Sequence, residues 1–278
     1  MVNLYRVPGP TAKESAPPER IISSSGIDLD PHHSPDGSRI VFGSTRSGKP
    51  EVWTCTSEGQ ECSRLASGFN PAWSPDGKSV AYTAGFDTGM ASIFVIHAEG
   101  GIPRQLTYGT EDYLPSWSSD ADSIYFLTVT EHRGETWQVP VVGGEPRQVT
   151  QGGGVNAMES SDGRYLFYAT HKQVRQAQIW RMELPEGEME LVVDTSPDYM
   201  NWDLWRDNIV YLNPHGEEGP RLEMVDPETR QSTLIQVLER SSVHSRGLSV
   251  SPDGQWIVFG NRDVAGSDLI LVKNFHVD

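Results

Sequence analysis

Six short, predominantly apolar segments recur along the chain, and each of them follows a polar turn. Two examples are Arg39–Phe42 (Arg-Ile-Val-Phe) and Ser79–Tyr82 (Ser-Val-Ala-Tyr). The remaining four are residues 123–126, 165–168, 208–211 and 256–259. Segments this short that are rich in β-branched and aromatic residues predict strands, and no helix-period segment of useful length competes with them. The pattern therefore predicts an all-β chain.

The turn before each apolar segment is itself a repeat. The tetrapeptide Ser-Pro-Asp-Gly stands at 34–37, 74–77 and 251–254, with worn copies at 118–121, 160–163 and 205–208. Its aspartates, which we call the marker aspartates, are 40 to 46 residues apart: Asp36, Asp76, Asp120, Asp162, Asp207 and Asp253. Ser, Pro, Asp and Gly in this order suit a type I turn between two strands. We therefore expect the marker aspartates at the rim of each repeated unit, with a structural role and no catalytic one.

Each unit continues with two further predicted strands. A third strand is expected at residues 51–53, 92–95, 136–139 and 178–181, and a glycine-bearing turn such as Glu99-Gly100-Gly101 leads to a fourth at 103–107 or 146–150. Four short antiparallel strands in a unit of about 43 residues are typical of a β-propeller blade. The six units together predict one six-bladed β-propeller.

The chain ends predict how the ring closes. The sixth unit ends with a predicted third strand at Asp268–Lys273, whereas Pro18–Ser23 reads as a fourth strand with Ile21 in the place of Leu106. We expect this N-terminal strand to complete the last blade, because closure removes the unpaired edges of a linear array. Residues 1–17, which contain several prolines, are then predicted to be an extended linker. The propeller is expected to span residues 18–278 as a single domain.

At this point the repeats resemble a known family. The pattern Trp-Ser-Pro-Asp-Gly, an apolar strand and Gly-Gly-x-Pro-Arg-x-Leu-Thr is similar to the TolB-type, WD40-like repeat, and Trp73–Thr107 matches it almost throughout. The resemblance covers residues 19–273, and the closing segment 267–275 looks most like the C-terminal sensor propellers of CadC-like bacterial transcriptional regulators. In those regulators a DNA-binding domain and a membrane helix precede the propeller, so the resemblance implies a separated sensory segment that works outside the cytoplasm, in the periplasm. It is specific for the fold and unspecific for function.

Composition narrows the classes of partner. The formal net charge is −16 and the isoelectric point is near 4.8, so nucleic acid is not an expected partner, because phosphate binding needs clustered Lys and Arg. No run of 18 apolar residues exists, which predicts no membrane insertion by this segment. The load of 8 Trp, 9 Tyr and 8 Phe argues against disorder. We expect a monomer that binds a protein partner or a small polar ligand.

The inner strand of every blade lines the central channel, so the residues before each turn are candidates for binding. The position six before the marker aspartate carries Asp30, Asn70, Leu114, Asn156, Asn201 and Gly247. Together with neighbouring residues they give our predicted ligand-binding ring: Asp30, Asn70, Asp112, Asn156, Asn201 and Arg246. Carboxylate and amide oxygens in a ring suit a small polar ligand or a hydrated divalent cation. The alternative is that these residues cap strand starts and bind channel water.

Histidines near the first turn raise the question of a transition metal. His33 stands where other units carry a packing tryptophan, so we expect it in the core. His32 and His244, with Asp30, are weak candidates for a metal site of the kind found in histidine-lined propeller lyases. Consecutive strand residues face opposite ways, so at most one of His32 and His33 can enter a shared site. No metal and no other cofactor is favoured.

The two cysteines, Cys55 and Cys62, align opposite each other across a predicted hairpin, at the places of Ile96 and Pro103. Directly opposed strand positions have Cβ atoms about 4.5–5.5 Å apart, close to what a disulfide requires. Two reduced thiols are the alternative, and the extracytoplasmic location implied by the resemblance favours the disulfide. Such a short loop would gain about 2 kcal/mol at most.

Signatures of catalysis are missing from the sequence. It has no Gly-x-Ser-x-Gly elbow, and no glycine-rich phosphate loop with a following Lys-Ser/Thr. Three function classes stay open. The leading one is a non-catalytic sensor or interaction propeller. The second is a metal-dependent propeller enzyme of the polysaccharide lyase or lactonase type, and the third is a passive scaffold. The aromatic residues Tyr199, Trp202 and Trp205 are expected to pack between blades, with a partner surface as the alternative.

Overall fold

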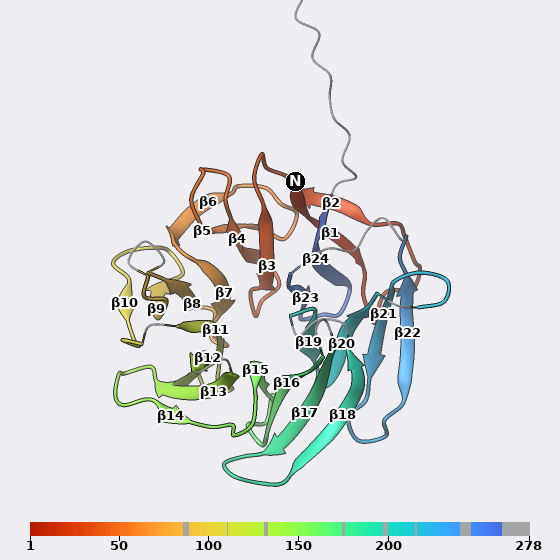
Figure 1. Ribbon diagram of the computed structural model, residues 1–278. Coiled ribbons are helices and arrows are strands. Elements are labelled where there is room, and N and C mark those ends of the chain that lie inside the picture. The colour runs from red at the N-terminus through yellow and green to blue at the C-terminus, as the bar shows by residue number, and fades with distance from the viewer. Residues whose placement is uncertain are drawn as a thin grey trace, which may run out of the picture.

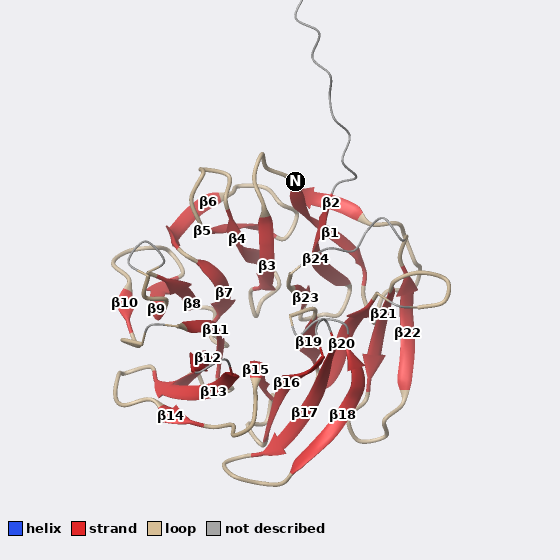
Figure 2. Ribbon diagram, viewed as in Figure 1, coloured by secondary structure: helices blue, strands red, loops and turns tan. Residues whose placement is uncertain are grey.

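The computed structural model is a ring of six four-stranded antiparallel sheets around a central axis (Figure 1). It describes residues 1–85, 89–109, 111–130, 133–173, 176–196, 200–214, 216–239 and 246–262. Within these ranges every regular element is a strand (Figure 2). No helix in the described part of the chain is long and apolar enough to span a bilayer. The predicted six-bladed all-β fold is confirmed.

Five blades follow the chain in order from the axis outwards. Blade 1 is β3 (Asp28–His33), β4 (Arg39–Ser44), β5 (Glu51–Thr56) and β6 (Ser63–Ser67). Blade 2 is β7 (Phe69–Trp73), β8 (Ser79–Ala84), β9 (Ser92–His97) and β10 (Arg104–Gln105). Blade 3 is β11 (Asp112–Trp117), β12 (Ser123–Thr130), β13 (Arg133–Pro140) and β14 (Arg147–Gln148). Blade 4 is β15 (Val155–Glu159), β16 (Tyr165–Gln173), β17 (Gln176–Glu183) and β18 (Met189–Ser196). Blade 5 is β19 (Trp202–Trp205), β20 (Asn208–Asn213), β21 (Arg221–Val225) and β22 (Ser232–Val237).

Blade 6 joins the two ends of the chain. Its inner strands are β23 (Leu248–Val250) and β24 (Trp256–Arg262), and its outer strands are β1 (Val2–Pro8) and β2 (Glu19–Ile22). The pairing of β1 with β24 runs without interruption from Val2 opposite Arg262 to Pro8 opposite Trp256. The ring is therefore closed from the N-terminus, as predicted, but by a hairpin of two strands.

The prediction of an extended linker over residues 1–17 is wrong for Val2–Pro8, which form the third strand of blade 6. The physical reason is the pair of apolar side chains Leu4 and Val7, which are both fully buried between neighbouring blades. Of the prolines that suggested a linker, Pro8 is the last residue of this strand and the others follow it. Asp268–Lys273, which we predicted for the same place, lie outside the described residues.

Apolar residues of adjacent blades form the core between them. Tyr82 and Trp73 of blade 2, for example, pack with Val41 and Val52 of blade 1. Trp202 is 1% exposed and Trp205 is 9% exposed, and both belong to inter-blade clusters. They therefore pack between blades and form no surface patch, whereas Tyr199 lies outside the described residues. These cores hold the inner strands in place around the axis.

The marker aspartates close the turns as their sequence predicts. In blade 1 the Ser34 hydroxyl and the Ser38 amide both donate to Asp36 Oδ1, at 2.6 and 3.0 Å. Equivalent serine hydroxyls donate to Asp76, Asp120, Asp162 and Asp253. Blade 5 differs, because its turn has only Arg206 and Asp207 between the strands, both with positive φ, and Asp207 instead accepts from Ser161 of blade 4.

Candidate functional site: the axial cavity

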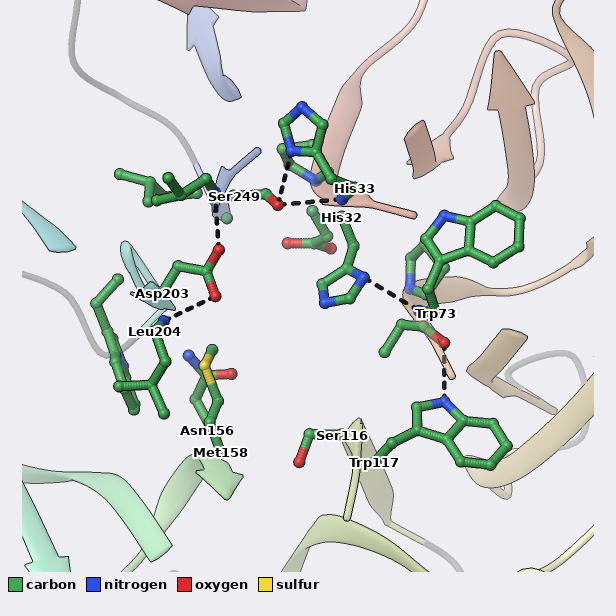
Figure 3. Close-up of a pocket in the computed structure, with 18 of the residues that line it drawn as sticks. His32, His33, Trp73, Ser116, Trp117, Asn156, Met158, Asp203, Leu204 and Ser249 are labelled. Carbon is green, nitrogen blue, oxygen red and sulfur yellow. Dashed lines mark hydrogen bonds between the residues drawn. The ribbon is translucent and has the colours of Figure 1, made fainter. Parts of the chain in front are cut away.

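A cavity of about 400 Å³ lies on the axis and is lined by the inner strands of all six blades. Side chains from distant parts of the sequence converge on it, as Figure 3 shows for His32, Ser116, Asn156, Asp203 and Ser249. Because each blade contributes one strand, the composition of the wall depends on what each inner strand carries at two register positions.

The first set, which we call the bulge positions, lies six residues before the marker aspartate. Its members share a positive φ, near 50° for the four side-chain-bearing residues and 86° for the glycine: Asp30, Asn70, Leu114, Asn156 and Gly247. In blades 1 to 4 the pairing register shifts at this point, for instance between Leu29 and His32. Left-handed backbone is tolerated best by Gly, Asn and Asp. The polar residues at this position are therefore of the types that the backbone conformation favours, and Leu114 adopts the same conformation in blade 3.

The predicted ligand-binding ring is assembled only in part. Asp30, Asn70 and Asn156 line the cavity, and Asn70 Nδ2 donates to Asp30 Oδ2 across the seam of blades 1 and 2, at 2.7 Å. Asp112 and Asn201 do not line it. Asp112 is buried and accepts from Thr128 Oγ1 at 2.8 Å.

Asn201 and Arg246 depart from the prediction for separate reasons. Blade 5 has no bulge, so Asn201 is displaced from the position that its neighbours occupy, and its carbonyl accepts from the Leu212 amide. Arg246 is exposed, and only its carbonyl reaches the ring, where it accepts from the Asp30 amide at 3.1 Å. Asn201 keeps the spacing of six residues before Asp207, but without the bulge this spacing does not place it in the cavity wall.

The second set, which we call the bridging positions, faces the cavity from every blade. Each member pairs with the middle residue of the following apolar strand, and all six line the cavity: His32, Ala72, Ser116, Met158, Asp203 and Ser249. Sequence reasoning singled out His32 and missed the other five. All five stand four residues before the marker aspartate of their blade, as His32 does, which is a signal that the sequence offered.

Four bridging side chains bond to the backbone of the next blade. His32 Nδ1 accepts from the Trp73 amide at 3.1 Å, and Asp203 Oδ2 accepts from the Val250 amide at 2.8 Å. Ser249 Oγ accepts from the His33 amide at 3.1 Å. Ser116 Oγ donates to the Ala157 carbonyl at 2.5 Å. These bonds tie adjacent blades together at the cavity wall and hold the side chains in one orientation.

The protonation state of His32 follows from its surroundings. Burial lowers the pKa of His32 to about 4, so the ring is neutral near pH 7. Its Nδ1 accepts a hydrogen bond, so the proton resides on Nε2. The ring extends into the space between the blades (Figure 3), and Nε2–H is thus a fixed donor for the cavity. Burial likewise lowers the pKa of His33, to about 4, and Nδ1 of His33 lies 3.1 Å from Ser249 Oγ.

The pKa of the bridging residue Asp203 is shifted upwards, whereas that of His32 is shifted downwards. Burial raises the pKa of Asp203 to about 6, although hydrogen bonds from the Val250 and Leu204 amides and from Ser249 counteract the rise. The carboxylate is nevertheless ionised at neutral pH. Asp203 thus places a negative charge on one wall of the cavity, while His32 places a neutral donor on another.

Large apolar side chains complete the wall. Trp73, Trp117, Trp205, Leu204 and Met158 line the cavity, and two of the indoles are anchored by hydrogen bonds. Trp117 Nε1 donates to the Ala72 carbonyl at 3.0 Å, and Trp205 Nε1 donates to the Pro252 carbonyl at 3.2 Å. A mostly apolar, concave wall with a few fixed polar groups is typical of a small-molecule site.

The residues for a transition metal do not assemble in the described part of the chain, where no three His, Cys, Asp or Glu side chains group as ligands. Nδ1 of His32 is already engaged by the Trp73 amide, and His244 lies outside the described residues. Cys55 and Cys62 are not available as metal ligands, because they are joined in a disulfide with a Cα–Cα distance of 4.1 Å.

The ring of six blades with an axial cavity defines a six-bladed β-propeller. The chain belongs to the family described as the TolB beta propeller domain, whose model matches residues 66–241. The solved structure of a putative TolB from Agrobacterium tumefaciens is similar, with a TM-score of 0.77, 17% identity and coverage of 95% of this chain and 100% of that one. At this identity the likeness shows the fold.

Two relatives are longer than the matched region. An uncharacterised protein of Agrobacterium fabrum is 27% identical over 131 residues, which are 46% of this chain and 44% of that protein. Dipeptidyl-peptidase 5 of Porphyromonas endodontalis is 24% identical over 213 residues, which are 72% of this chain and 30% of the peptidase. The match thus spans less than half the length of each of these relatives.

Proposed function

We propose that this propeller is a non-catalytic binding domain that takes a small polar ligand, or a segment of a protein partner, into its axial cavity. The observation that carries the proposal is the cavity of about 400 Å³ whose wall is contributed by all six blades. Backbone amides of the neighbouring blades donate hydrogen bonds to His32, Asp203 and Ser249 and hold that wall in place. A wall that is ordered before binding loses little conformational entropy when a ligand enters.

One group of cavity residues contains the serine, histidine and aspartate of a catalytic triad, but not in the order that catalysis requires. Ser249 Oγ lies between His33 and Asp203, with which it forms hydrogen bonds. In a catalytic triad the histidine stands between the acid and the hydroxyl, which must be exposed to substrate. Here the hydroxyl stands in the middle, is 2% exposed and also accepts from a backbone amide. This supports a structural role for Ser249 and a binding function for the cavity.

The proposal extends to location and biological role. We place the domain outside the cytoplasm, in the periplasm of a bacterium, as the sensory part of a regulator or envelope complex. The resemblance to CadC-like sensor propellers supports this role. The Cys55–Cys62 disulfide supports the location, because disulfides persist in oxidising compartments.

A second candidate function comes from the comparison with dipeptidyl-peptidase 5. The matched region is 30% of that peptidase, so this chain corresponds to a part of it. On this reading the propeller is the non-catalytic domain of a larger hydrolase and guides peptides. Both candidates place binding in the propeller, and they differ in whether peptides are preferred over other ligands.

The experiment is a thermal-shift screen of small polar compounds and short peptides against two variants. Ala72→Met narrows the cavity with the side chain that blade 4 carries at the equivalent bridging position, Met158. Val142→Met is the matched control, because Val142 is 90% exposed and outside the cavity. We expect compounds that raise the Tm of the wild type and of Val142→Met to lose at least ten-fold in affinity for Ala72→Met.

Two results would count against the proposal. Unchanged affinities in Ala72→Met would move binding away from the cavity, and a partner that binds both variants equally with no small-molecule hit would indicate a passive scaffold. Stoichiometric divalent metal that disappears on chelation, together with turnover of a polysaccharide or lactone, would indicate the metal-dependent enzyme.

A further inference from the structure

The charges that face the axial cavity are unbalanced. Its lining contains six titratable side chains: Asp30, His32, His33, Glu159, Asp203 and Arg206. Both imidazoles are neutral at pH 7, which leaves three carboxylates against one guanidinium. Arg206 is exposed and stacks on the Trp205 ring at 4.6 Å, so its charge lies at the margin of the site.

The three carboxylates approach the cavity from different blades. Asp30 belongs to blade 1, Glu159 to blade 4 and Asp203 to blade 5, and each is already tied to protein donors. Asp30 accepts from Asn70, Glu159 from Tyr125 Oη at 2.6 Å and Asp203 from the Val250 amide. The carboxylates are thus dispersed around the wall and individually held, which is poor geometry for chelating one metal ion but lowers the potential throughout the cavity.

The space between the carboxylates is apolar. Trp73, Trp117, Trp205, Leu204 and Met158 contribute to the wall between them. Apolar walls favour ligands with a hydrocarbon body. His32 Nε2–H adds one donor for a hydroxyl or carbonyl group of the ligand.

We infer that the axial cavity selects monocationic organic amines with an apolar or aromatic body over neutral and anionic compounds of the same shape. This inference rests on the proposed function, because it specifies the class of ligand for the same cavity. The overall charge of −16 acts in the same direction, since it raises the local concentration of cations around the protein.

The test is a matched series of probes measured by isothermal titration calorimetry and saturation-transfer NMR at pH 7.5: phenethylamine as the cation, 2-phenylethanol as the neutral compound and 3-phenylpropanoate as the anion. We expect phenethylamine to bind at least ten-fold more tightly than 2-phenylethanol, and 3-phenylpropanoate to bind most weakly.

Two variants remove one carboxylate each. Asp30→Asn is well matched to the fold, because the same left-handed position carries asparagine in Asn70 and Asn156. Asp203→Asn keeps an oxygen for the Val250 amide. Each variant should lower the affinity for phenethylamine about five-fold or more and leave that for 2-phenylethanol unchanged. Asp122→Asn, at an exposed position outside the cavity, should change neither.

The outcomes separate this inference from the proposed function. Equal affinity for the three probes, a preference for the anion, or no binding of phenethylamine up to 10 mM would overturn the inference of charge selection. The proposed function is judged by Ala72→Met: if that variant weakens 2-phenylethanol binding, the cavity binds ligands even where charge selection has failed. If phenethylamine binding survives both Asp30→Asn and Asp203→Asn unchanged, the selectivity does not come from the cavity wall.

Discussion

The bulge positions and the bridging positions lie two residues apart on the same inner strands, yet different forces determine what they carry. At the bulge positions the backbone is left-handed, so Asn, Asp and Gly are selected by their own conformational energy. At the bridging positions the backbone is extended, and four of the six side chains form hydrogen bonds with the backbone of the next blade, as His32 does with the Trp73 amide. Polar residues in a channel wall therefore do not by themselves indicate a ligand.

The largest loss of stability is expected at Gly247, a bulge position where no side chain fits. In Gly247→Ala the new Cβ would lie 2.6 Å from Asp30 Cα and 3.0 Å from the Asp30 amide nitrogen, at a φ of 86°. Neither backbone atom can move without disturbing the hydrogen bond from the Asp30 amide to the Arg246 carbonyl. We expect a loss of about 3 kcal/mol or more in the free energy of unfolding, measured by urea denaturation.

The control for this variant is Asp30→Asn, directly across the same contact. It keeps a residue that tolerates left-handed backbone, so the free energy of unfolding should change by less than about 1 kcal/mol. Equal destabilisation by Gly247→Ala and Asp30→Asn would show that the contact between blades 6 and 1, and not the conformation, limits stability here.

At the bridging positions, His32 makes the free energy of unfolding depend on pH. The pKa of His32 is about 4 in the folded protein and near 6.5 when unfolded, so its contribution to stability is complete above pH 6.5 and is lost as the pH falls towards 4. At pH 5 the loss is about 2 kcal/mol. His32→Ala should reduce the fall in urea stability between pH 7.5 and pH 5 by that amount, and blade 2 shows that alanine is tolerated there, at Ala72.

Asp203 acts with the opposite sign. Its folded pKa of about 6 exceeds the unfolded value of 3.8, so the ionised form is destabilising above pH 6 and its protonation adds about 1 kcal/mol of stability at pH 5. The two residues therefore partly offset each other in the wild type. His97→Ala, at an exposed histidine, is the control and should leave the pH dependence unchanged. A wild-type and a His32→Ala profile of the same slope would contradict the assigned protonation states.

The sequence was sufficient for the repeat and the ring, because Ser-Pro-Asp-Gly and the apolar strand after it are local signals. It was sufficient for only half of the cavity wall. Asp30, Asn70 and Asn156 were found by their spacing, but the reason for their polarity is a φ value that spacing does not reveal. Asp203 was missed although it stands four residues before Asp207, at the same spacing as His32 before Asp36, because the spacing of six residues was used to choose the candidates. The strand Val2–Pro8 was missed because its partner, β24, is 250 residues away.

The smallest loss of stability is expected at Asn156, a bulge position where a substitution changes mainly the conformational energy of the backbone. Asn156 lines the cavity with a φ of 49°, so Asn156→Ala changes the conformational preference of the residue without a large change in volume. Alanine is less tolerant of left-handed backbone, and we expect a loss of about 1 kcal/mol in the free energy of unfolding. Asn156→Gly, which has no Cβ to strain, should stay within about 0.5 kcal/mol of the wild type.

The stabilities and ligand affinities of Asn156→Ala and Asn156→Gly distinguish between the two explanations of the polar pattern. If conformation selects asparagine here, glycine replaces it without loss and alanine does not, in the absence of any ligand. If the amide is instead retained for binding, both variants weaken a cavity ligand such as phenethylamine to the same degree, including Asn156→Gly, whose stability is unchanged. Urea denaturation and calorimetry on the same two proteins therefore show whether the bulge positions belong to the backbone or to the binding site.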